Sequence, residues 1–120
     1  NLWLVEENTS NSAGNLCLHL IGNLNHFIGA VLGKTGYIRE REKEFTAKNT
    51  PRSEIVAQIE ATEKMISEVL PTLTAEDLER NFPINVFGQP MTTEYFLIHL
   101  TTHLSYHLGQ INYHRRLLDK

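Results

Sequence analysis

The chain has 120 residues, of which 41% are hydrophobic and 21% charged, and its formal net charge at pH 7 is −3. A chain of this size can bury one hydrophobic core, so we expect a single domain over residues 1–120. The acidic balance lacks the basic surface of nucleic-acid-binding proteins, and the apolar stretches, broken by Asn, His or Thr, do not predict a membrane span. No secretory signal segment is recognisable, and the single cysteine, Cys17, excludes a disulfide within the chain. We therefore expect a cytoplasmic protein with no nucleic-acid or membrane partner.

The first predicted helix runs from Ala13 to about Leu32. Its apolar residues recur at steps of three and four, as on one face of a helix: Leu16, Leu20, Leu24, Phe27, Ile28 and Val31. Ser10 or Ser12 can cap its start, because a short hydroxyl accepts from the first free backbone N–H groups. The sequence GKTG at residues 33–36 predicts its end.

A second long helix is predicted after the alternating charges of residues 39–44, which we interpret as a solvated segment. Thr50 is the predicted N-cap, with Pro51 in the first helical position, and Pro71 ends the helix. Its predicted buried stripe consists of Ile55, Ile59, Thr62, Ile66, Val69 and Leu70. Thr74 to Asp77 then predicts a short capped turn of helix.

The last predicted helix begins at Thr92 or Thr93 and continues to Leu118. The segment before it, residues 81–91, alternates apolar residues with two prolines and a glycine. This pattern predicts a short hairpin-like excursion, not a sheet. The predicted fold class is therefore all-α.

Four of the six histidines lie on this last helix, and His99, His103, His107 and His114 fall within an arc of roughly 80°. Two imidazoles four residues apart on one face can hold one metal ion. A metal site needs at least a third protein ligand. His19 is the candidate, because an unpaired imidazole on an apolar helix would be costly to bury. We predict that His19, His103 and His107 bind a divalent metal.

His99 and Gln110 are the predicted catalytic residues. His99, one turn before His103, could be a fourth ligand, a hydrogen-bond partner of a ligand, or a substrate-facing base. Gln110 shares the histidine face and could orient a ligand imidazole or a bound substrate. The amides of Asn15 and Asn23 share the face of His19, and either could serve the same purpose or only join helices.

The histidines and the cysteine also have purely structural interpretations. His19 could be a core histidine bonded to a backbone carbonyl, and His26 and His114 lie too far along their helices to share the ion. Cys17 points about 160° from His19 on a helix, so it is not expected to complete the site. HExxH, phosphate-binding glycine loops and an inward pair of carboxylates are absent from the sequence.

Four segments together resemble the DinB-like (DinB/YfiT) superfamily, in an uncharacterised branch: NSAGNLCLHLIGNLNHFIGAVLG, IREREKEF, VFGQPMT and HLTTHLSYHLGQINYHRR. The resemblance implies an up-down bundle of four helices, often a homodimer. It also implies a divalent ion, nickel or zinc, held by three histidines that match His19, His103 and His107. Relatives in that superfamily include transferases that use a low-molecular-weight thiol as cosubstrate.

One departure from the superfamily pattern concerns the start of the chain. Members usually carry a long helix before the first helix predicted here, so we expect an N-terminal helix to be missing from this chain. An upstream segment or a partner chain would then cover the open apolar flank. The expected function is metal-dependent transfer of a low-molecular-weight thiol to a small electrophile, or hydrolysis of a small molecule. The alternative is a non-catalytic, stress-associated metal-binding or dimerisation bundle.

Overall fold

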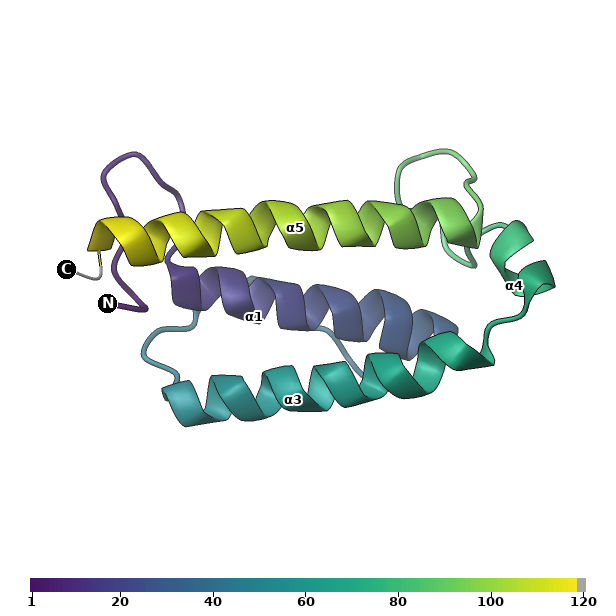
Figure 1. The fold of residues 1–120 in the computed structure, drawn as a ribbon, viewed down its shortest axis with the longest axis horizontal. Helices are drawn as coiled ribbons and strands as arrows, with labels where there is room; N and C mark the ends of the chain where they lie inside the picture. Colours follow the sequence, from purple (N-terminus) through teal and green to yellow (C-terminus); the bar gives the residue numbers. More distant parts are fainter. Residues whose placement is uncertain (119–120) are drawn as a thin grey trace.

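The computed structural model describes residues 1–118 and contains three long helices that lie side by side (Figure 1). Helix α1 (Ala13–Leu24) continues as a π-helix, η1 (Asn25–Leu32), and is followed by α3 (Arg52–Val69) and α5 (Thr93–Leu118). Two short helices, α2 (Arg41–Thr46) and α4 (Ala75–Glu79), and a 3-10 turn, η2 (Leu70–Thr72), complete the described chain. Residues 1–118 contain no strand, so the prediction of an all-α fold is confirmed.

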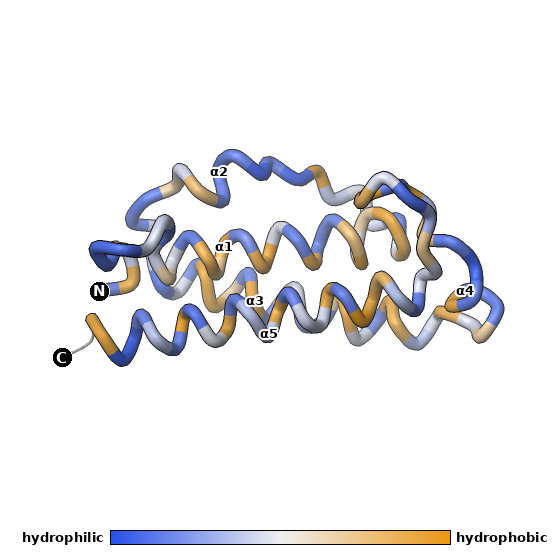
Figure 2. The backbone as a smooth tube through the Cα atoms, turned by 90° about the horizontal axis from the view of Figure 1, so that it is seen from above, coloured by the Kyte–Doolittle hydropathy of each residue, from blue (hydrophilic) through white to orange (hydrophobic). Residues whose placement is uncertain are grey.

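Helices α1 and α3 run in the same direction, and α5 runs against both (Figure 1). The chain between α1 and α3 must therefore return along the bundle, and α2 lies in this return segment, residues 33–51, beside α1 (Figure 2). The chain alternates in direction, as in an up-down bundle, only if the return segment is counted as one of four elements, in the order α1, return segment, α3 and α5. Asn15 fastens the segment, because its buried amide donates to the backbone carbonyls of Glu44, at 3.0 Å, and Ala47, at 2.8 Å.

Side-chain caps start three of the helices where the sequence predicts them. The backbone N–H of Asn15 donates to Ser12 Oγ at 3.1 Å, and that of Tyr95 donates to Thr92 Oγ1 at 3.1 Å. Thr74 and Asp77 form a reciprocal capping box at α4. The predicted start of α3 is wrong by one residue: Pro51 is the N-cap, the first helical residue is Arg52, and no side chain caps this end.

An aromatic cluster forms the core at the end of the bundle near α4. Phe82 stacks on Phe96 with ring centroids 4.1 Å apart. Phe82 reaches this position because its N–H donates to the Met91 carbonyl, which closes the loop between α4 and α5. The predicted hairpin-like excursion is confirmed, with a single bridge between Asn81 and Thr92. The buried members of this core are Ile28, Val69, Phe82, Phe96 and Leu100.

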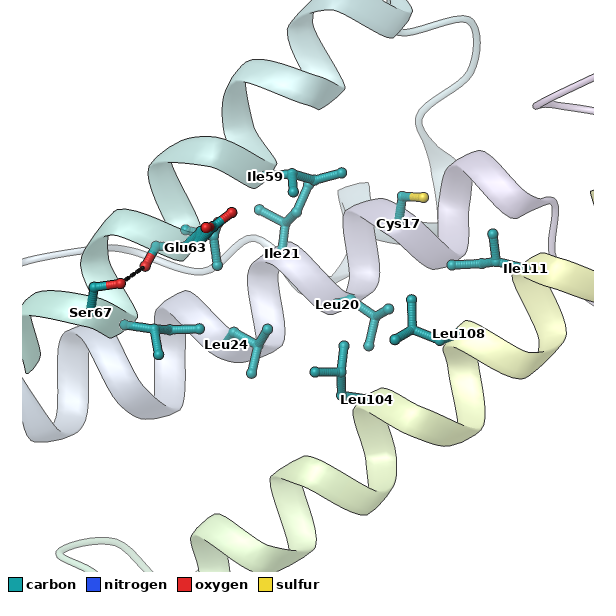
Figure 3. Close-up of a pocket in the computed structure, with 12 residues that line it drawn as sticks. Cys17, Leu20, Ile21, Leu24, Ile59, Glu63, Ser67, Leu104, Leu108 and Ile111 are labelled. Carbon is teal, nitrogen blue, oxygen red and sulfur yellow. Dashed lines mark hydrogen bonds between the residues drawn. The ribbon is translucent and has the colours of Figure 1, made fainter. Parts of the chain in front are cut away.

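An apolar groove of about 290 Å³ remains open between α1, α3 and α5 (Figure 3). Its walls include Leu20, Leu24, Ile59, Leu104, Leu108 and Ile111. The predicted burial of Ile59 and Leu70 is wrong: Ile59 is 43% exposed in the groove wall, and Leu70 is exposed at the end of α3. Among residues 1–118, α3 packs mainly on α1 and η1, so Ile59 faces the open groove instead of a covering helix.

The first helix, Ala13–Leu32, is long and apolar enough to cross a membrane if only length and composition are considered. Half of it is buried inside the bundle, and its buried polar side chains Asn15 and His19 bond to other segments. This burial is typical of the core helix of a globular domain. The absence of a membrane partner stays a prediction.

Candidate metal centre

Three imidazoles converge where α1 crosses the middle of α5. Nε2 of His103 lies 3.2 Å from Nε2 of His19 and 3.2 Å from Nε2 of His107. One ligand nitrogen from each ring lies within 4.8 Å of the other two. Metal–nitrogen bonds of about 2.0–2.1 Å at tetrahedral angles separate their nitrogens by about 3.3–3.4 Å. The spacing of the three rings therefore fits one shared ion.

The partners of the Nδ1 atoms set which nitrogen of each ring carries a lone pair. His19 Nδ1 lies 3.0 Å from a carboxylate oxygen of Glu44, and His107 Nδ1 lies 2.6 Å from the amide oxygen of Gln110. Oxygen acceptors of this kind place the hydrogen on Nδ1. Nε2 of both rings then points a lone pair toward His103, the orientation that partners of metal-binding histidines usually impose.

His103 has no bonded partner for its own Nδ1, which is buried and unsatisfied among residues 1–118. Burial, followed by the nearby His107, His19 and His99 and then the Arg39 guanidinium, lowers the pKa of His103 to about 4. The ring is therefore neutral at pH 7 and can offer a lone pair to a cation. Nε2 atoms of His19 and His107 that both lie 3.2 Å from Nε2 of His103 form, with it, a set of three imidazole donors that fits a divalent metal.

Glu44 supports this cluster from the return segment. Arg39 donates to both of its carboxylate oxygens, from Nε at 2.8 Å and from Nη2 at 2.9 Å. Burial alone would raise the pKa of Glu44, but the hydrogen bonds from His19 and Arg39 outweigh burial and leave this pKa below its ordinary value. The prediction that residues 39–44 are a solvated segment is wrong for these two side chains, which are 12% and 7% exposed.

Gly22 makes room for the Glu44 carboxylate. A Cβ atom built at Gly22 would clash with the Glu44 carboxylate. Gly22 lies three residues after His19, so it shares a face of α1 with that histidine. A glycine inside an apolar helix indicates a close approach by another segment, but it does not identify that segment as one carrying a carboxylate.

Of the remaining predicted site residues, His99 and Asn23 line a side pocket of about 230 Å³. We define this pocket by His19, His103, His99, Asn23, Arg39 and Arg41 together with the loop residues Val86 and Phe87. His99 lies outside the three-histidine cluster, with its ring centre 6.4 Å from that of His103, and faces the pocket. Gln110 contacts His107 instead. Asn15 donates to the return segment, so its amide hydrogens join two segments of the chain and are not bonded to a histidine of the cluster.

Cys17, His26 and His114 are separate from the cluster, as the sequence predicts. Cys17 lines the apolar groove (Figure 3), whereas His19 lines the side pocket. Burial raises the pKa of its thiol. His114 is buried, near the start of α1, and His26 packs against Phe27.

The fold and the cluster define an all-helical protein with a three-histidine candidate metal centre. Over residues 1–120 the chain matches the family model described as "Protein of unknown function (DUF1572)", and it belongs to that family. No curated protein and no solved structure matches the chain. The resemblance to the DinB-like superfamily therefore stays a prediction.

Proposed function

We propose that the protein is a metal-dependent enzyme in which His19, His103 and His107 hold a divalent ion, nickel or zinc. The observation that carries this proposal is the convergence of three Nε2 atoms, two of them oriented by Nδ1 partners. Imidazole suits zinc, nickel and copper, and the availability of the metals decides among these ions.

The number of ligands favours catalysis over a purely structural site. Structural zinc sites usually have four protein ligands, whereas catalytic sites have three and an open position. A metal held this way supplies Lewis acidity, which lowers the pKa of a bound water or thiol. The proposed reaction is transfer of a low-molecular-weight thiol to a small electrophile, or hydrolysis of a small molecule. His99, in the side pocket, would face the substrate, and Gln110 would hold His107.

The first test is the metal content of tag-free protein by plasma mass spectrometry, beside the variants His19→Ala and His103→Ala. We expect about one equivalent of nickel or zinc in the wild type and its loss in both variants. Circular dichroism would verify that the variants stay helical. A folded His103→Ala variant that binds metal as tightly as wild type would refute the three-histidine site.

The second test is turnover of a thiol with an epoxide or a haloaromatic electrophile. Product formation that depends on the metal supports the enzyme. Metal binding without turnover of any thiol or ester would favour the alternative, a non-catalytic metal-binding or dimerisation bundle.

A different observation favours self-association. Of the twelve residues that line the apolar groove, only Glu63 is charged. Exposed apolar surfaces of this kind often mark protein interfaces. We propose that a second copy of the chain covers the groove in a homodimer. Sedimentation equilibrium of the wild type and of Leu108→Glu tests this, because a buried carboxylate in the interface should shift the population to monomer.

A further inference from the structure

The side pocket next to the three histidines has a positive rim. Arg39 and Arg41 line it, and no aspartate or glutamate of residues 1–118 does. The neighbouring charges Glu40 and Lys43 pair with each other at 2.7 Å and line a separate surface depression. Within residues 39–43, Arg39 and Arg41 therefore line the pocket beside the histidines, whereas Glu40 and Lys43 line the other depression. This local excess of positive charge occurs in a chain whose net charge is −3.

The two arginines differ in how far their charge is already compensated. Arg39 forms two hydrogen bonds to Glu44, so most of its charge is neutralised. Arg41 has no carboxylate within ion-pair distance among the described residues, and its guanidinium lies 5.3 Å from the centre of the Phe45 ring. Phe45 in turn packs on His19, with ring centroids 4.9 Å apart. Arg41 is thus held beside the cluster with its charge available to an anion.

Aromatic side chains also line the pocket. Phe87, from the loop before α5, packs edge-on against His99 with ring centroids 4.7 Å apart and lies 6.1 Å from Phe96. Phe87 is half exposed, so a bound apolar group would cover it. A pocket of 230 Å³ lies below the range of about 300–1,000 Å³ that is usual for drug-sized ligands. The pocket therefore suits a small molecule with an apolar body.

Asn23 adds a polar contact at the base of the pocket. Its side chain is 7% exposed, and its Oδ1 atom has no hydrogen-bond partner among residues 1–118. A buried amide without a partner is costly, unless a ligand supplies the missing bond. This unsatisfied amide is independent of the arginines, and it also points to a bound polar group.

We propose that the side pocket binds small carboxylic acids with an aromatic or aliphatic body, and that the substrates of this site are acids whose body also carries the electrophilic or hydrolysable group. The carboxylate lies at the Arg41 and Arg39 guanidinium groups, and the apolar body lies against Phe87 and Phe96. Asn23 Oδ1 accepts a hydrogen bond from a donor group on the body of the acid. The assignment as substrate rests on the proposed metal-dependent function, whereas the binding itself depends only on residues of the pocket.

The test is an NMR titration of ¹⁵N-labelled protein, with and without metal, using benzoate and its uncharged counterpart benzamide. We expect benzoate to bind about tenfold more tightly than benzamide in the metal-free protein, because a guanidinium–carboxylate bond is charge-assisted. Amide signals of the α2 start and of residues 86–100 should shift. Equal affinities for the two probes would overturn the proposal.

Two matched variants separate a local site from general charge. Arg41→Gln should weaken benzoate binding about tenfold and leave benzamide binding unchanged. Lys43→Gln removes the same charge two residues away, on the other side of the return segment, and should change neither. If both variants weaken benzoate binding equally, the proposal is wrong.

The body of the ligand and the metal have their own controls. Phe87→Ala should weaken both probes to the same extent, and acetate should bind less tightly than benzoate. If acetate binds as tightly as benzoate, the claim that an apolar body packs against Phe87 and Phe96 is wrong. A wild-type protein that takes up no metal but binds benzoate would refute the proposed enzymatic function and leave the acid-binding pocket standing.

Discussion

Nδ1 of His19 lies 3.0 Å from Oε1 of Glu44, and this contact joins two residues that are 25 positions apart in the chain. His19 belongs to the long helix α1, whereas Glu44 belongs to the short helix α2 in the return segment. The return segment therefore connects α1 to α3 and also orients a histidine of the candidate metal centre. The arrangement requires Asn15 to fasten the segment and Gly22 to leave space for the carboxylate.

Replacing Glu44 with Gln should weaken metal binding about 10–100-fold, the usual effect of losing a partner that orients a ligand histidine. The amide has nearly the same shape but no charge, so the hydrogen bond to His19 weakens and Arg39 loses its counter-ion. Competition with a chromophoric chelator measures the affinity. Glu40→Gln is the control, because Glu40 is exposed and bonded to Lys43. Unchanged affinity in Glu44→Gln would show that the contact does not tune the site.

A methyl group at Gly22 should displace the Glu44 carboxylate. We expect Gly22→Ala to lower the free energy of unfolding by about 1–3 kcal/mol, as overpacking does, and to weaken metal binding together with it. Gly109→Ala is the matched control, because a Cβ there meets nothing within 4 Å. In the middle of α5 it should raise stability by about 0.5–1 kcal/mol. Urea denaturation of both variants gives these values, and a stabilised Gly22→Ala would contradict the packing described here.

The contrast between His19 and Glu44 shows how far the sequence predicts this site. His103 and His107 lie on one helix, and helical periodicity alone places them on one face. His19 follows from its apolar surroundings, where an imidazole needs a partner. Glu44 could not be predicted, because its place depends on the path of an irregular return segment. The alternating charges of residues 39–44 favour a solvated segment. The Glu44 carboxylate is nevertheless buried, because Arg39 donates hydrogen bonds to it and Gly22 on α1 leaves space for it.

The exposure of Ile59 has a similar origin. Its spacing with Ile55 and Ile66 predicts a buried position, and Ile55 is indeed buried. Periodicity reports which residues share a face of a helix, but it does not report whether a neighbour covers that face. The caps of α1, α4 and α5 could be predicted, since each depends only on residues within one turn.

Asn15 should be the most sensitive polar residue outside the cluster. It is fully buried and donates to two carbonyls of the return segment. Asn15→Ala leaves both carbonyls without this donor, so we expect a loss of about 2 kcal/mol or more in the free energy of unfolding. Chemical denaturation measures the loss. Asn112→Ala, an exposed position on α5, should stay within about 0.5 kcal/mol of wild type. Equal stability of the two variants would contradict the anchoring role.

Cys17 should react slowly with alkylating agents. Burial raises the pKa of its thiol, so less thiolate, the reactive form, is present at pH 8 than in an exposed cysteine. We expect iodoacetamide to modify Cys17 more slowly than free glutathione at pH 8. The rate should increase at more alkaline pH, as the thiol ionises. Mass spectrometry of timed samples measures it. Modification as fast as that of glutathione would contradict the raised pKa of the Cys17 thiol.

The contact of Gln110 with His107 separates two roles of the Gln110 side chain, one through the histidine and one on the substrate. Its amide oxygen lies 2.6 Å from His107 Nδ1, so any effect of this side chain on the candidate metal centre would pass through that histidine. Gln110→Leu keeps most of the volume and removes the acceptor, and metal affinity should fall about tenfold or more. If Gln110 instead contacts only the substrate, metal affinity stays at the wild-type value and only turnover falls. Asn112→Ala, two residues along the same helix, controls for general effects on α5. Gln110→Glu restores an acceptor for His107 and should recover the metal affinity that the leucine variant loses, a rescue that a purely structural role of the side chain would not give.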